Sequence, residues 1–184
     1  MPHVSIQHII GTVALIGLAV SIALAYQIIV SSVEESVIKT QLNQTAEYIS
    51  MSLTNVISLT DFTYGIISTS EPVTKHLDLP EMIGGKPYNI TIVKREEEYY
   101  VHVEIIGRSD LYAESPIIVK STQRIRILAG VDLEIAESLL EDFDVEPRAW
   151  VIGSTLEVVV WCYKYYEDDV MYAGLGILGG GPQT

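Results

Sequence analysis

The chain has 184 residues, enough for one helical segment and one domain of roughly 120 residues. Its formal net charge is −13, carried almost entirely after residue 33. This acidity argues against nucleic acid, which is bound through clustered Lys and Arg, and against anionic lipid head groups. Cys162 is the only cysteine, so an intramolecular disulfide is excluded as well.

A long uncharged run opens the chain. Residues 4–33 contain no Asp, Glu, Lys or Arg. A helix needs ~20 apolar residues to cross a bilayer, and this run exceeds that length. A cleavable secretory signal has a basic start, a short apolar region and a small-residue cleavage site, and none of these fits well. We therefore predict a permanent apolar helix that can span a membrane.

Small residues interrupt the large aliphatic ones in this run. They allow helix backbones to approach closely, which favours association with other helices; the alternative is an ordinary single-pass anchor. The small residues are Gly11, Ala14, Gly17, Ala19, Ala23 and Ala25.

Weak signals favour an external position for the residues that follow. Glu34 and Glu35 come directly after the apolar run. The triplets that begin at Asn43 and Asn89 match the acceptor pattern for N-glycosylation, which makes these two residues glycosylation candidates.

The helix is predicted to continue beyond the apolar run. Residues 36–59 contain no Gly or Pro, and apolar residues recur at spacings of three and four. We expect one helix over residues 5–59, on the order of 80 Å long at ~1.5 Å per residue. Residues 4–33 are apolar all round, whereas residues 34–60 are amphipathic and can carry a domain on one face. The predicted stripe is Ile38, Leu42, Thr45, Ile49, Leu53 and Val56.

After residue 60 the pattern changes to short strands separated by Gly and Pro. We predict strands at 73–79, 88–94, 99–106, 116–120, 123–128, 148–152, 156–166 and 170–178. Within 131–143 we expect a short helix, for which Asp132 is the candidate cap, or a loop with helical turns. The strand 99–106 pairs with 88–94, and 116–120 pairs with 123–128. The strand 156–166 is apolar on both faces, so we expect it to lie centrally. The predicted fold class is α+β: a long N-terminal helix (residues 1–60) and an all-β, immunoglobulin-like β-sandwich head (residues 61–184).

The sequence carries no recognisable catalytic constellation. His3 and His8 lie in the apolar segment, while His76 and His102 stand alone on strands, where a histidine is usually a polar-face residue. Cys162 is expected to be a small core residue. Glu141, Asp142, Asp144 and Glu146 form an acidic cluster, in which Asp142 and Asp144 are the candidates for a metal such as calcium, although we expect a solvated loop. We therefore predict a structural or interaction protein that is not an enzyme and needs no cofactor.

Two stretches carry a family resemblance that extends to about residue 106. The apolar stretch 9–17 reads IIGTVALIG, and the stretch 79–92 reads LPEMIGGKPYNITI. With an amphipathic helical half and a β-sandwich after the first stretch, the chain resembles archaeal type IV pilin-like proteins.

The resemblance implies a structural subunit of an extracellular filament. The apolar half-helices, over residues 6–30, would bundle into the filament core and the heads would form the outer surface. Its partners would be other copies of itself, an assembly ATPase and a membrane platform protein, with insertion in the cell membrane before assembly. The residues expected to pack in the core are Ile9, Ile10, Gly11, Val13, Ala14, Leu15, Gly17, Leu18, Ile22, Leu24 and Ile28.

One departure from the family pattern keeps a second function open. Members cleaved by the prepilin peptidase carry a short basic leader, whereas residues 1–8 contain no Lys or Arg. Either this is the mature chain or the protein is not processed. In the second case it resembles a membrane-anchored accessory subunit of the archaeal motility filament (the archaellum), a stator whose head binds the surface-layer protein. A third hypothesis is an anchored external binding or enzyme domain, supported by the acidic cluster at 141–146.

Overall fold

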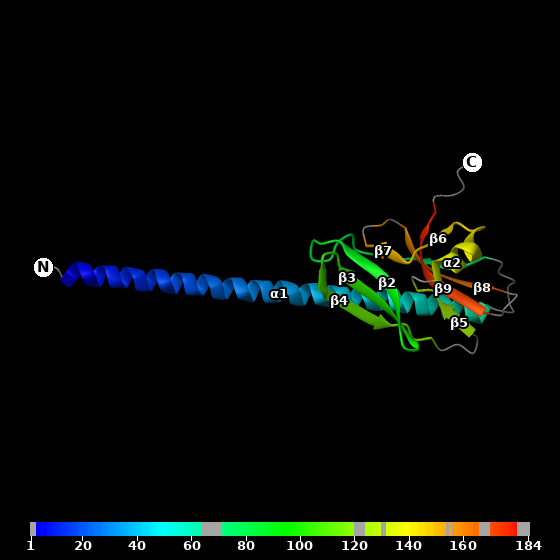
Figure 1. The fold of residues 1–184 in the computed structure, drawn as a ribbon, viewed down its shortest axis with the longest axis horizontal. Coiled ribbons are helices and arrows are strands. Elements are labelled where there is room, and N and C mark those ends of the chain that lie inside the picture. Colours follow the sequence, from blue (N-terminus) through cyan, green and yellow to red (C-terminus); the bar gives the residue numbers. More distant parts are fainter. Residues whose placement is uncertain are drawn as a thin grey trace. The chain divides into compact units, whose positions relative to one another are not determined.

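A computed structural model describes residues 3–63, 71–119, 124–129, 132–153, 155, 157–165 and 170–179. It divides into two compact units, Met1–Val37 and Ile38–Thr184. A long helix that is apolar in its first half is followed by a domain with two β-sheets (Figure 1). This is the α+β layout that the sequence predicts.

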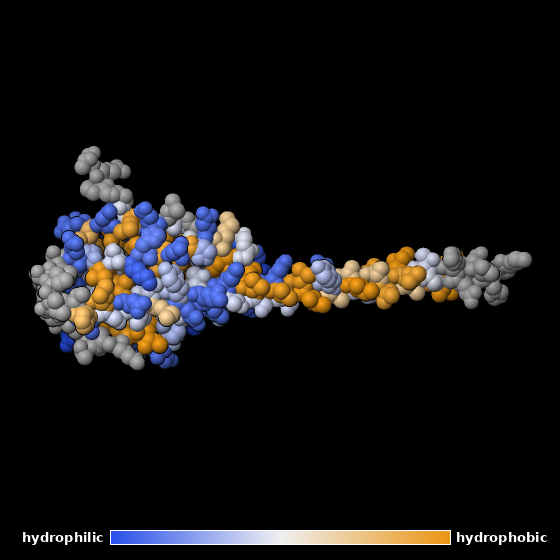
Figure 2. Space-filling view, turned by 180° about the vertical axis from the view of Figure 1, so that it is seen from behind, coloured by the Kyte–Doolittle hydropathy of each residue, from blue (hydrophilic) through white to orange (hydrophobic). Residues whose placement is uncertain are grey.

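Helix α1 (His3–Thr63) is continuous for 61 residues and contains the predicted 5–59. Within the described residues of the first unit, the large apolar side chains are exposed apart from the half-buried Val30, and the orange atoms of this segment show them in Figure 2. The helix is long and apolar enough to cross a membrane, and its most apolar window of 18 residues contains no buried residue. Its hydrophobic surface is therefore available to lipid or to other helices.

The second half of α1 belongs to the core of the head. All six residues of the predicted stripe are buried, and Ala46 and Ile57 join them. The polar residues on the other side, such as Gln41, Asn43 and Glu47, are exposed. The apolar members of the stripe share one hydrophobic cluster with inward side chains from both sheets, including Val103 and Val160. The period of the stripe thus fixes which face of the helix the head covers.

The four-stranded sheet has the order β4-β3-β2-β7 and is antiparallel throughout. Its strands are β2 (Tyr88–Arg95), β3 (Glu98–Ile105), β4 (Arg108–Pro116) and β7 (Trp150–Ile152). Burial alternates along each strand, as period-two side-chain placement requires. The predicted pairing of 88–94 with 99–106 is confirmed.

The five-stranded sheet has the path β1-β8-β9-β5, with β6 also paired to β9. Its strands are β1 (Val73–His76), β5 (Arg124–Ile127), β6 (Val145–Pro147), β8 (Val158–Tyr165) and β9 (Val170–Leu178). The central position predicted for the apolar strand is confirmed, because β8 lies between β1 and β9 and both of its faces are covered.

Several predicted elements differ from the structure. Residues 117–119 form no strand; residues 108–116 form β4 instead, which pairs with β3. The strand β5 runs parallel to β9 rather than pairing with the segment before it. The acidic segment contains β6, paired with β9. For β5 and β6 the deciding pairing is with β9, which is distant in sequence, whereas β4 forms a hairpin with the adjacent β3.

The short helix α2 (Leu133–Leu140) covers the outer face of the five-stranded sheet. Ala136 and Leu140 pack there with Trp161, whose Nε1 donates to the Leu175 carbonyl at 2.9 Å. Asp132 precedes the helix but makes no side-chain cap; its carboxylate accepts instead from Arg126 at 2.8 Å. The predicted cap is therefore wrong, because a guanidinium in reach provides a charge-assisted bond.

The segment 79–87 holds α1 against the head. It is part of the stretch 79–92, one of the two on which the family resemblance rests. Its Gly84 has φ +57° and donates its backbone N–H to Gln41 of α1 at 3.2 Å. A Cβ at Gly84 would lie 2.4 Å from Cγ1 of Ile38, so only glycine fits both the turn and the close approach to the helix. At the end of this segment, the hydroxyl of the buried Tyr88 donates to the Pro80 carbonyl at 2.7 Å.

Candidate functional site

The first candidate surface is the apolar helical segment of α1. Gly11, Ala14 and Gly17 are exposed, and nothing lies within 4 Å of a Cβ built on either glycine. The eight large residues predicted to pack against other helices are 57–71% exposed: Ile9, Ile10, Val13, Leu15, Leu18, Ile22, Leu24 and Ile28. Moving such a side chain fully out of water lowers the free energy by about 1.5–3 kcal/mol. Burial of this segment in lipid or against other helices is therefore strongly favoured.

One hydroxyl in this segment is satisfied by the helix itself. The Ser21 hydroxyl donates to the Gly17 carbonyl at 2.9 Å, four residues earlier. A hydroxyl bonded in this way is compatible with an apolar environment, where an unpaired polar group would cost several kcal/mol. The segment therefore suits either lipid or a dry helical bundle.

The second candidate surface is the outer face of the four-stranded sheet. Strand pairing sets Ile152, Asn89, Glu104 and Tyr112 in one row across the sheet. The next row is Trp150, Thr91, His102 and Glu114. Trp150 is 55% exposed and Tyr112 is 48% exposed. This face carries aromatic and polar side chains in place of the aliphatic ones on the inner face.

His102 lies at the centre of a polar network on this face. Its Nδ1 is 2.9 Å from a Glu114 carboxylate oxygen, and its Nε2 is 3.5 Å from Glu104. Arg95 also pairs with Glu114, and the imidazole stacks on the Tyr112 ring with centroids 5.3 Å apart. Each ring nitrogen faces a carboxylate, which fixes the ring and ties β3 to β4.

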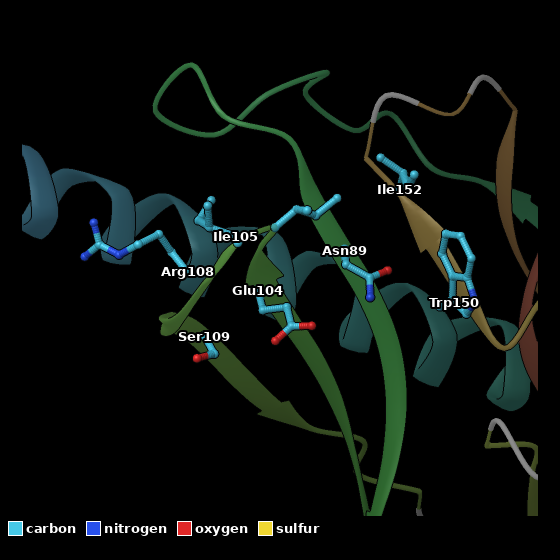
Figure 3. A pocket seen from close by; sticks show the side chains of 9 residues that line it. Asn89, Glu104, Ile105, Arg108, Ser109, Trp150 and Ile152 are labelled. Atoms are coloured by element: carbon cyan, nitrogen blue, oxygen red, sulfur yellow. The ribbon is translucent and has the colours of Figure 1, made fainter.

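A pocket of about 630 Å³ opens at one end of this face, where β3 turns into β4 (Figure 3). The Asn89 side chain lies between those of Glu104 and Trp150, in agreement with the strand order β3-β2-β7. Asn89 Oδ1 is buried and makes no hydrogen bond with any described residue. The pocket is lined by Asn89, Glu104, Ile105, Ile106, Gly107, Arg108, Ser109, Trp150 and Ile152.

Electrostatics within the pocket leave it slightly acidic. Arg108 makes two hydrogen bonds to Asp110, at 2.8 and 2.7 Å. These bonds lower the pKa of the Asp110 carboxyl to about 2, so the Arg108 charge is matched by a carboxylate at any physiological pH. Glu104 adds a further acidic side chain to the wall of the pocket.

The two glycosylation candidates lie in different environments. Asn43 is exposed on α1, but the Thr45 of its triplet is buried in the core. Asn89 and Thr91 lie on the same outer face of β2, both half-buried. Of these two triplets, the structure thus places only the second with both of its polar side chains on the outer face of the sheet, where they are half-buried.

The acidic cluster does not converge on a metal site. Asp142 and Asp144 are exposed, as are Glu141 and Glu146, and Glu146 pairs with Arg148. Among the described residues, no group of three or more His, Cys, Asp or Glu side chains is arranged to hold a metal ion.

The other residues singled out from the sequence are dispersed. Cys162 is buried in the head, and burial raises the pKa of its thiol to about 11, which disfavours the reactive thiolate. His76 ends β1, far in sequence from the network around His102. The side chains of His3 and His8 lie outside the described residues.

Sequence reasoning missed the pocket and its tryptophan. Asn89 and Trp150 are distant in sequence, and only the pairing of β2 with β7 brings them together. The local signal was an exposed tryptophan directly before the buried Val151 on a short strand. No protein-family model, curated protein or solved structure matches this chain.

Proposed function

We propose that the chain is a structural subunit of an archaeal type IV pilus-like extracellular filament, which polymerises through its apolar N-terminal helix. One observation carries this proposal: α1 is a single helix whose second half lies in the core of the head, while the apolar side chains of its first half are exposed. A simple tether needs no such continuity, because a flexible linker would serve.

In a filament, the apolar segments would bundle with their small residues facing one another, and each head would take a fixed place on the outer surface. Before assembly, the same segment would hold the subunit in the cell membrane. An assembly ATPase and a membrane platform protein would then extract it.

A second function is supported by the exposed face of the four-stranded sheet. An aromatic and polar surface that includes Trp150 and Tyr112 is of the kind that proteins use to dock partners. A membrane-anchored accessory subunit of the archaellum would use such a head to bind the surface-layer protein.

Electron microscopy of native cell-surface filaments, with mass spectrometry of the subunit and its N-terminus, separates the two functions. A pilin is present along the whole filament, with residues 6–30 in a dry core. An accessory subunit is absent from the filament and remains in the membrane fraction.

A matched pair of variants sharpens this test. Leu18→Lys would place a charge within the bundle and should abolish filaments, because burying an unpaired charge is very costly. Gln44→Lys adds the same charge to an exposed position of α1 in the head, and filaments should persist. Filaments that survive Leu18→Lys would overturn the proposal.

A further inference from the structure

The pocket beside Trp150 combines an open indole with an unsatisfied acceptor. A buried polar atom without a partner is uncommon in a folded protein, because the lost hydrogen bonds with water are not replaced. Asn89 Oδ1 is such an atom, and it lies at the pocket wall between Glu104 and Trp150. Because Oδ1 is closed off from the pocket in this position, a ligand that supplies a hydroxyl donor would satisfy it once the Asn89 side chain turns toward the pocket.

The same ligand must also cover apolar surface. Trp150 is 55% exposed, and Ile106, at the turn on the opposite side of the pocket, is 48% exposed. An amphipathic ring with C–H groups on its face and hydroxyls at its edge meets both requirements, since the indole offers a flat apolar face. Ser109 and Glu104 add further polar groups for the ring edge.

Charge narrows the class of ligand. Arg108 is engaged bidentately by Asp110, Glu104 contributes a negative charge, and the chain as a whole carries −13. An anionic ligand would be repelled, whereas a neutral one has no such cost. We propose that this pocket is a binding site for a neutral saccharide, with one pyranose ring resting on Trp150 and, after the Asn89 side chain turns toward the pocket, a hydroxyl donating to Asn89 Oδ1.

The saccharide has two conceivable sources with the same chemistry. It can belong to a separate glycan, such as one on a neighbouring molecule. It can also be a glycan attached to Asn89 itself, because Thr91 completes the acceptor triplet on the same face of β2 and pairs directly with Trp150. In both cases Trp150 is the platform, and neither case depends on whether the protein forms filaments.

The first arm of the test uses the full chain from a host that does not glycosylate it, held in a detergent without sugar head groups. Methyl α-mannopyranoside, methyl β-glucopyranoside and chitobiose are the probes, followed by saturation-transfer NMR and tryptophan fluorescence. At least one neutral probe should bind, Trp150→Ala should weaken binding at least ~tenfold, and glucuronic acid should bind more weakly than glucose. Tyr112→Ala is the matched control, because it removes an exposed aromatic of the same face outside the pocket.

The second arm uses the protein from its native cells. Glycopeptide mass spectrometry reports whether Asn89 is modified, and acrylamide quenching reports the exposure of Trp150. An attached glycan should protect Trp150 relative to the Thr91→Val variant, which keeps Asn89 but loses the triplet. Binding in the first arm with an unmodified Asn89 assigns the site to a separate glycan.

Three results would overturn the proposal. The first is an unmodified Asn89 together with no binding of any neutral probe. The second is an attached glycan that leaves the quenching of Trp150 unchanged. The third is probe binding that survives Trp150→Ala, or a dimer that forms through Trp150 and excludes the probes.

Discussion

Gly153 lies directly against the ring of Tyr88, so that a Cβ at position 153 would be 2.0 Å from the Tyr88 Cζ atom. The two residues are also joined through their backbones, since the Gly153 N–H donates to the Tyr88 carbonyl at 3.0 Å. Tyr88 is fully buried and anchors the segment that holds α1. This contact therefore connects the end of β7 to the attachment of the long helix.

Gly153→Ala should destabilise the head, because neither the ring nor the bonded backbone can move without disturbing the core. We expect a loss of about 2–3 kcal/mol, at the upper end of the usual cost of overpacking. Urea unfolding followed by circular dichroism measures it. Gly85→Asn is the control, since φ +70° at that position suits Asn and nothing lies within 4 Å of the new Cβ. Equal losses in the two variants would contradict this role of Gly153.

The second half of α1 should contribute to head stability as a core element. Leu53 is fully buried, whereas Met51 on the same helix is 66% exposed. Leu53→Ala should cost about 3–4 kcal/mol through lost burial and the cavity left behind. Met51→Ala should cost less than about 0.5 kcal/mol, as expected of an exposed site. Thermal unfolding of the full chain distinguishes them, and similar midpoints would mean that the helix does not belong to the core.

The buried faces of α1 and β3 could be predicted because each follows from the local order of apolar and polar residues. The spacing of Ile38, Leu42 and Ile49 identified the buried face of α1, and alternation from Tyr100 to Ile105 identified both faces of β3. Such patterns reflect the geometry of one element and need no knowledge of its neighbours.

The parts that sequence reasoning missed either lack a clear local pattern or depend on pairing between segments that are distant in sequence. The inward positions of β4 include Ala113 and Ser115, which are small or polar and give little hydrophobic alternation. The strand β6 forms in the acidic segment because β9 offers it a free edge at its C-terminal end. The pocket required β7 to pair with β2 before Trp150 could lie near Asn89.

The head should lose stability in strongly alkaline solution. Burial raises the pKa of Tyr88 from its ordinary value of 10.0 to about 12, and that of Cys162 from 9.0 to about 11. Because both pKa values are higher in the folded state, the unfolded state loses these protons first. Their stabilising contribution is complete below pH 9 and decreases as the pH rises from 9 to 12, with a slope of at most ~1.4 kcal/mol per pH unit for each group.

Unfolding free energies measured between pH 8 and pH 12 test this alkaline effect. Cys162→Ala should reduce the slope of the unfolding free energy against pH between pH 9 and 11. Tyr88→Phe should reduce this slope between pH 10 and 12. A slope that neither variant alters would show that other groups cause the loss.

The turn between β2 and β3 contains a strained residue. Glu96 has φ +54°, a left-handed conformation that Asn adopts more readily than Glu. Glu96→Asn should raise stability by about 0.5–1 kcal/mol. Glu97→Asn is the control, because it removes the same charge from the neighbouring turn residue, which has no positive φ. The comparison separates the effect of the lost charge from the effect of the backbone conformation. If both variants gain equally, repulsion among the glutamates, rather than the backbone, is the cause.

The central claim is that the apolar segment of α1 packs against copies of itself. A photo-crosslinking residue at position 18, introduced in native cells, tests it most directly, with the exposed position 51 in the head as the control. We expect a ladder of covalent homo-oligomers from position 18 and none, or a different pattern, from position 51. Crosslinks from position 18 to lipid alone would contradict it.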